Sequence, residues 1–144
     1  MEWVREKVEE RICTIINKLK RISQKTAALI ALFIGFMSVI AGVKVLLGID
    51  AKVYNILTWL VYYNVIMGIV SIYTAVLIWR NKSSFKIFAS SILAMHFMIF
   101  IFLKFFSVNS ASESVKAMVF RTSIWILIII LSILIPNYFK RKQK

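Results

Sequence analysis

Four long apolar runs dominate the hydrophobic pattern of the chain, at residues 27–47, 53–79, 87–106 and 115–139. A helix needs about 20 mostly apolar residues to cross a hydrocarbon core of roughly 30 Å, and each run is long enough. The alternation of apolar and polar positions that marks a membrane β-strand does not occur. The pattern predicts an all-α integral membrane protein. Because the connections are short, residues 26–139 are expected to form a four-transmembrane-helix antiparallel bundle.

Residues 1–25 have a different pattern, with one apolar stripe among charged positions. Spacings of three and four place the stripe on one face of a helix; its members are Val4, Val8, Ile12, Ile15, Leu19 and Ile22. We expect an amphipathic interfacial helix that lies in the headgroup plane on the cytoplasmic side. A docking helix for a partner or for a second copy, through the same heptad-like stripe, is the alternative.

Three sequence features concern the ends of helices. Gly48 follows the first run, as is typical of a helix C-terminus. The spacing of Ser110 and Glu113 is that of a capping box before the fourth helix. Pro136 falls near the end of the fourth run, where we expect few backbone hydrogen bonds to be lost.

Composition and charge agree with a membrane location. The 144 residues are 60% hydrophobic and carry a net charge of +13. Of the 19 Lys and Arg, 14 lie on the side of the two termini and of the second connection, so the positive-inside rule predicts a multi-pass protein of the plasma or inner membrane with both termini cytoplasmic.

The basic residues are expected to contact anionic lipid and not nucleic acid, because no aromatic-lined basic groove accompanies them. The basic tail, residues 140–144, belongs to this group. The predicted contacts are Lys18, Lys20, Arg21, Lys25, Arg80, Lys82, Lys140, Arg141 and Lys142.

Small residues form a stripe in each of the first two spans. Membrane helices pack through small residues that let two backbones approach, so we expect the two stripes to face each other. They consist of Ala31, Gly35, Ser38 and Gly42 in the first span, and of Gly68, Ser71 and Ala75 in the second. Ile128, in the fourth span, is expected to face lipid or a partner.

Three polar side chains lie inside the spans. The side chain of Arg121 either snorkels to the lipid headgroups or turns inward to Asn64. In the second case an outward-facing polar pocket forms for an anionic or carbonyl-bearing ligand, with Tyr62, Tyr63 and Glu113 nearby and Trp125 against the arginine. His96 is expected to be neutral with its N–H satisfied. Haem or metal would need a further ligand and His96 is the only histidine, so no cofactor and no metal are predicted.

No catalytic residue is predicted, because the sequence shows no base beside a nucleophile and no CxxC or HExxH motif. No carboxylate lies within the interior of a span, which argues against proton-coupled transport. The sequence therefore favours a non-enzymatic accessory, scaffold or structural subunit, with a membrane protein partner or a homo-oligomer as its assembly. A small oligomeric channel or transporter, and a lipid- or quinone-binding protein that uses the pocket near Asn64 and Arg121, are the alternatives.

Overall fold

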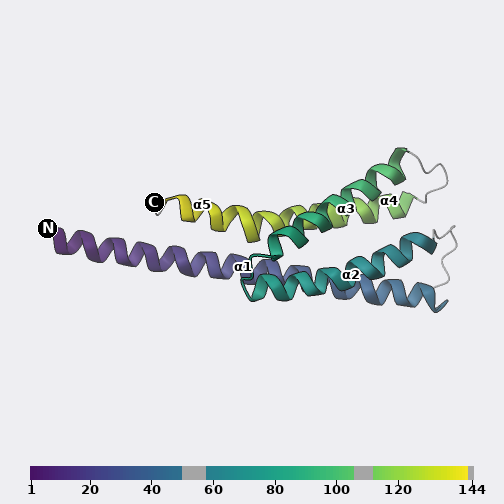
Figure 1. Ribbon diagram of the computed structural model, residues 1–144, viewed down its shortest axis with the longest axis horizontal. Helices are drawn as coiled ribbons and strands as arrows, with labels where there is room; N and C mark the ends of the chain where they lie inside the picture. Colours follow the sequence, from purple (N-terminus) through teal and green to yellow (C-terminus); the bar gives the residue numbers. More distant parts are fainter. Residues whose placement is uncertain (50–57, 106–111, 143–144) are drawn as a thin grey trace.

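A computed structural model describes residues 1–49, 58–105 and 112–142, with only the backbone described for residues 112–114 and 140–142. All regular elements in these ranges are helices (Figure 1). They are α1 (Glu2–Leu46), α2 (Thr58–Trp79), α3 (Phe85–Phe105), α4 (Ser112–Ile129), the π-helical turn η1 (Ile130–Leu134) and α5 (Ile135–Lys142). The first three helices and the stretch Val115–Phe139 are long and apolar enough to cross a membrane. The prediction of an all-helical chain with four potential spans is confirmed.

α1 contains both the amphipathic segment and the first span, without a break between them. It has 45 residues, so at 1.5 Å per residue it is about 68 Å long, more than twice the thickness of a hydrocarbon core. In Figure 1 its N-terminal half extends past the end of α2. We call residues 2–25 the arm. The structure does not show the expected separate helix turned into the headgroup plane, because an unbroken helix bends only gently and the arm continues the direction of the span.

The helix ends beside two of the connections share one backbone geometry. At the end of α1, Gly48 has φ +70°, and the N–H of Ile49 donates to Lys44 O at 3.1 Å. At the end of α2, Asn81 has φ 53°, and the N–H of Lys82 donates to Leu77 O at 3.1 Å. Both are Schellman motifs, which satisfy the last helical carbonyls through one left-handed residue.

α1 and α2 pack backbone against backbone. A Cβ atom added to Gly35 would lie 2.8 Å from Gly68 O, and one added to Gly68 would lie 2.9 Å from Gly35 O. Gly42 faces Val65 and Val61 further along, so the two helices run in opposite senses. Only glycine permits this approach.

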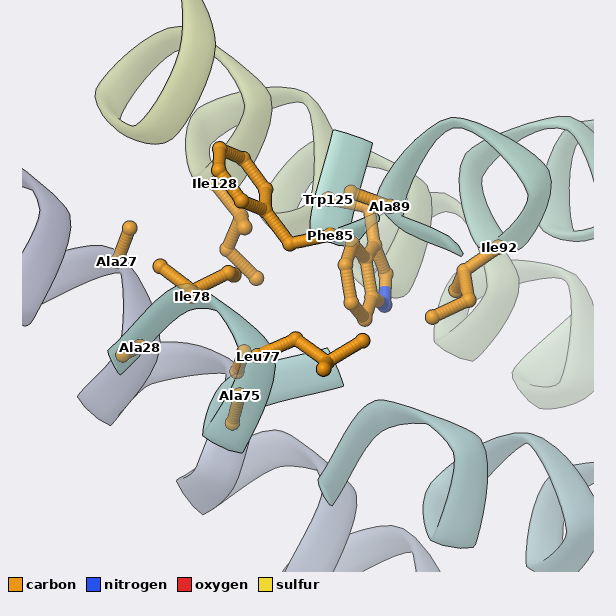
Figure 2. Close-up of a cluster of buried hydrophobic side chains, with 11 residues drawn as sticks. Ala27, Ala28, Ala75, Leu77, Ile78, Phe85, Ala89, Ile92, Trp125 and Ile128 are labelled. Atoms are coloured by element: carbon orange, nitrogen blue, oxygen red, sulfur yellow. The ribbon is translucent and has the colours of Figure 1, made fainter. Parts of the chain in front are cut away.

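The main hydrophobic core lies at the end of the bundle near residues 80–84 and includes the fully buried Ile78, Ile92, Trp125 and Ile128. Figure 2 shows residues of all four spans converging there, with Phe85 reaching from the start of α3. A second, smaller cluster of Leu60, Leu103 and Met118 lies toward the opposite end of the spans. The expectation that Ile128 faces lipid or a partner is wrong, because its side chain is 0% exposed.

The fourth span contains the π-helical turn η1 directly before Pro136. Ile135 donates its backbone N–H to Ile130 O, five residues earlier, so Leu131 O loses the donor that an α-helix would supply. The residue five positions after Leu131 is Pro136, which has no N–H to offer. The hydroxyl of Ser23 in α1 replaces the missing backbone donor and donates to Leu131 O at 2.6 Å.

Pro136 therefore changes the helix more than its position near the end of the span suggested. The helix continues beyond it as α5 to Lys142, and its effect is one carbonyl freed in the preceding turn. Because Ser23 binds that carbonyl, the proline creates a polar link between the arm and the last span. The sequence expectation that few backbone hydrogen bonds are lost at Pro136 did not include this link.

Candidate functional site

The intramembrane polar residues form one layer between the two hydrophobic clusters. On α2, Tyr63 and Asn64 lie between Leu60 of the smaller cluster and the residues of the main core. His96 on α3 and Arg121 on α4 occupy equivalent places on their helices. The sequence hypothesis named these four residues, and the structure brings them together as two pairs.

Arg121 turns inward and donates from its Nη1 atom to the Asn64 side-chain oxygen. Its guanidinium has five N–H donors, and this bond uses one of them. No ion pair to Arg121 occurs among the described side chains. Glu113, which the sequence hypothesis placed nearby, and Asp50 lie outside them. Arg121 is thus a cation inside a span with an amide as its hydrogen-bonded partner.

His96 is buried at 3% exposure and is bonded from two sides. Its Nδ1 atom lies 2.9 Å from Ile92 O and 3.3 Å from the Tyr63 hydroxyl. Because a carbonyl only accepts, Nδ1 carries a proton, and the Tyr63 oxygen is its second acceptor. The contact of Tyr63 with His96 connects α2 to α3. The bond of the next residue on α2, Asn64, with Arg121 connects α2 to α4.

Trp125 does not belong to this layer. Its side chain is 0% exposed within the main core (Figure 2), and no cation–π contact with Arg121 occurs among the described residues. Among the residues that the structure describes, the Nε1 atom of Trp125 has no hydrogen-bond partner. The indole was expected against the stem or the guanidinium of Arg121; the contact with the guanidinium is not what the structure shows, and the contact with the stem stays a prediction.

Four buried or half-buried hydroxyl groups of the spans are already used. Ser71, Thr74, Thr122 and Ser132 each donate to the carbonyl four residues earlier, at 2.6 to 2.8 Å. Such back-bonding satisfies a hydroxyl inside the helix that carries it. Within the described ranges, no three His, Cys, Asp or Glu side chains gather as a metal site requires. The polar groups of the layer therefore connect helices, and none of these hydroxyls is paired with a base.

Comparisons of the chain with protein-family models, with curated proteins and with solved structures find no match. Three structural features of the chain bear on its function. These are the polar layer, the arm and the basic residues at the end of the spans near residues 80–84.

The small-residue stripes lie where α1 meets α2. Ala31, Gly35, Ser38, Gly42, Gly68, Ser71 and Ala75 are all buried. In the third span, in contrast, the small residues Ser90 and Ala94 have exposed side chains. α1 and α2 thus form a closely packed antiparallel pair, from which the arm extends.

The basic residues of the arm and of the connection after α2 are mostly exposed. Lys20 is half-buried, and the others have exposed side chains: Lys18, Arg21, Lys25, Arg80 and Lys82. The Nζ atom of Lys25 lies 5.1 Å from the centroid of the Trp79 ring. Lys140, Arg141 and Lys142 fall outside the described side chains.

Sequence reasoning missed the link between Ser23 and Leu131 O. Its signal was Pro136, since a proline inside a helix frees a carbonyl in the preceding turn. The pattern could have indicated the freed acceptor. It could not indicate Ser23 as the donor, because that pairing depends on how the arm passes the last span.

Proposed function

We propose that the protein is a non-enzymatic structural subunit of the membrane, whose four antiparallel spans hold the arm in place for assembly with further copies of the same chain. The observation that carries this proposal is the open stripe of the arm. Its six apolar residues, Val4 to Ile22, are each between 46% and 57% exposed. An apolar stripe of this length on a helix outside the bundle calls for a cover.

The chain's own C-terminal helix does not provide that cover. α5 and η1 pack beside α1, and on the η1 side Ser23 donates to Leu131 O next to the buried Gln24. The stripe residues remain exposed on another face. Because the described part of the chain leaves the stripe exposed, we propose that another chain packs on it.

A second copy fits because membrane insertion gives all copies the same orientation. Their arms then run parallel and in register, as a parallel coiled coil requires. From Val8 the stripe follows a heptad repeat, with Ile12 and Leu19 at a positions and Val8, Ile15 and Ile22 at d positions. β-branched residues at d favour three or four strands over two. Anchoring in one membrane also raises the effective concentration of the arms. This compensates for the weak association expected of a coiled-coil interface that extends only from Val8 to Ile22.

In the same proposal, both termini are cytoplasmic and the membrane is the plasma or inner membrane. The support is the excess of Lys and Arg on the arm, on residues 80–86 and at the C-terminal end. Anionic headgroups on that side would interact with these residues at about 1 kcal/mol each.

The mass of the purified protein in mild detergent, measured by light scattering, tests the assembly. We expect three or four times the chain mass of 16.7 kDa. The double variant Ile15→Lys with Leu19→Lys should be monomeric, because two charges per arm would be buried in the seam. Asn17→Lys, on an exposed position off the stripe, is the matched control and should keep the wild-type mass. A monomeric wild type, or an unchanged mass of the double variant, contradicts the proposal.

The bond between Arg121 and Asn64 favours a second candidate function, the binding of an anionic or carbonyl-bearing lipophile such as a quinone or a lipid. Most N–H donors of the guanidinium are not used by Asn64. A buried cation is stabilised when an acceptor reaches those donors. A channel or transporter has no comparable observation in its favour.

Lipophiles that copurify with the protein test this candidate by mass spectrometry. Arg121→Met should lose the retained molecule. Lys116→Met, an exposed position on the same helix, should keep it. Equal retention by both variants contradicts a role of Arg121 in binding.

A further inference from the structure

A groove of about 380 Å³ lies between α1 and α2, at the end of the spans near residues 80–84. It lies where the small, buried Ala28 and Ala75 line the contact between the helices. The larger side chains beside these alanines form the walls of the groove. Its volume is within the range of ligand pockets, about 300–1,000 Å³. The groove is lined by Ala28, Leu29, Leu32, Val76, Trp79 and Arg80.

The groove is apolar along its length and basic at one end. Arg80 is the first residue after α2 and is exposed. Lys25, one helix away, places its Nζ atom 5.1 Å from the centroid of the Trp79 ring, which itself lines the groove. Tryptophan and basic residues at the end of a span lie at the level of the headgroups. The apolar part then lies at the depth of the acyl chains.

We infer that this groove is a binding site for one anionic phospholipid, with an acyl chain along the groove and the phosphate between Lys25 and Arg80. Two cations at one rim select against a headgroup that carries its own positive charge. The apolar lining matches a hydrocarbon chain, which leaves no polar group unpaired. The site is separate from the polar layer and from the stripe proposed for assembly, and its failure would leave both untouched.

Native mass spectrometry tests the site with equal amounts of phosphatidylglycerol and phosphatidylcholine added to the detergent-purified protein. Wild type should retain phosphatidylglycerol preferentially. Lys25→Gln and Arg80→Gln should each lower that preference about fivefold, which corresponds to about 1 kcal/mol per cation at 1.4 kcal/mol per tenfold. Lys86→Gln removes the same charge from an exposed position near the same end of the spans, and it should leave the preference unchanged.

A second variant separates the acyl chain from general attraction to charge. Val76 is 42% exposed, so Val76→Phe fills the groove from its open side without entering the α1–α2 contact. It should abolish retention of the bound lipid, whereas Ile69→Phe, at 57% exposure on the same helix, should not. Equal retention of both lipids by wild type overturns the inference. So does a Val76→Phe variant that still holds its lipid, or a Lys86→Gln variant that loses as much preference as Arg80→Gln.

Discussion

Replacing Gly35 with alanine puts two opposite effects of one methyl group in competition. In a helix interior, alanine is more favourable than glycine by about 1 kcal/mol, so propensity alone predicts a more stable protein. The added Cβ atom, however, would lie 2.8 Å from Gly68 O and 3.0 Å from the backbone N of Ile72. These are backbone atoms, which no change of rotamer can move, so α1 and α2 must separate.

The contact effect should exceed the propensity effect. Inserting a methyl group into a well-packed contact costs about 1–3 kcal/mol. After subtraction of the propensity gain, Gly35→Ala should lower the free energy of unfolding by about 1 kcal/mol. Gly35→Leu should lower it by more than about 2 kcal/mol, since its whole side chain points into α2.

Reversible unfolding by SDS in mixed micelles, followed by circular dichroism, measures these free energies. Ala41→Leu is the matched control, because Ala41 lies on the exposed face of α1 and should change stability by less than about 0.5 kcal/mol. The reasoning is refuted if Gly35→Ala is more stable than wild type by about 1 kcal/mol, the value expected from propensity alone. It is also refuted if Ala41→Leu is as damaging as Gly35→Leu.

Two further predictions concern the last span. Ser23→Ala should destabilise the protein by about 1 kcal/mol or more, because it leaves a carbonyl without its donor. In a Pro136→Ala background, where the helix can use its own N–H groups, the same change should cost much less. A double-mutant cycle of unfolding free energies that shows no coupling would contradict the link. Ile128→Ala should lose about 2–5 kcal/mol of stability by opening a cavity in the core, whereas Ile126→Ala, at 46% exposure, should lose little. Equal thermal stability of the two variants would contradict the assigned core.

The four spans follow from the sequence because length and apolarity alone decide whether a helix can cross a membrane. The small residues also indicated the α1–α2 contact, since a glycine such as Gly35 is unfavourable in a helix unless a close approach needs it. Ile128 shows the limit of this reasoning. Lipid-facing and core positions in a span are both apolar, so composition does not tell which one a given isoleucine occupies.

The arm shows a second limit. Its amphipathic pattern predicts a helix with an open apolar face, and the same pattern suits a headgroup surface or a neighbouring helix. The difference lies in whether the helix breaks before the span. No glycine or proline stands between Ile22 and Ala31, and α1 is continuous there. Likewise, the sequence named Asn64 and Arg121 as possible partners but not the inward rotamer of the arginine, which depends on packing across two helices.

Disulfide crosslinking of the arm in native membranes tests the proposed assembly most directly. With Cys13 first replaced by serine, Ile15→Cys places a thiol on the stripe and Asn17→Cys places one at an exposed position off it. Parallel arms in register bring the d positions of neighbouring copies together, so mild oxidation should link Ile15→Cys into covalent dimers and leave Asn17→Cys monomeric. The absence of a crosslink at position 15, or equal crosslinking at both positions, would contradict assembly through the stripe.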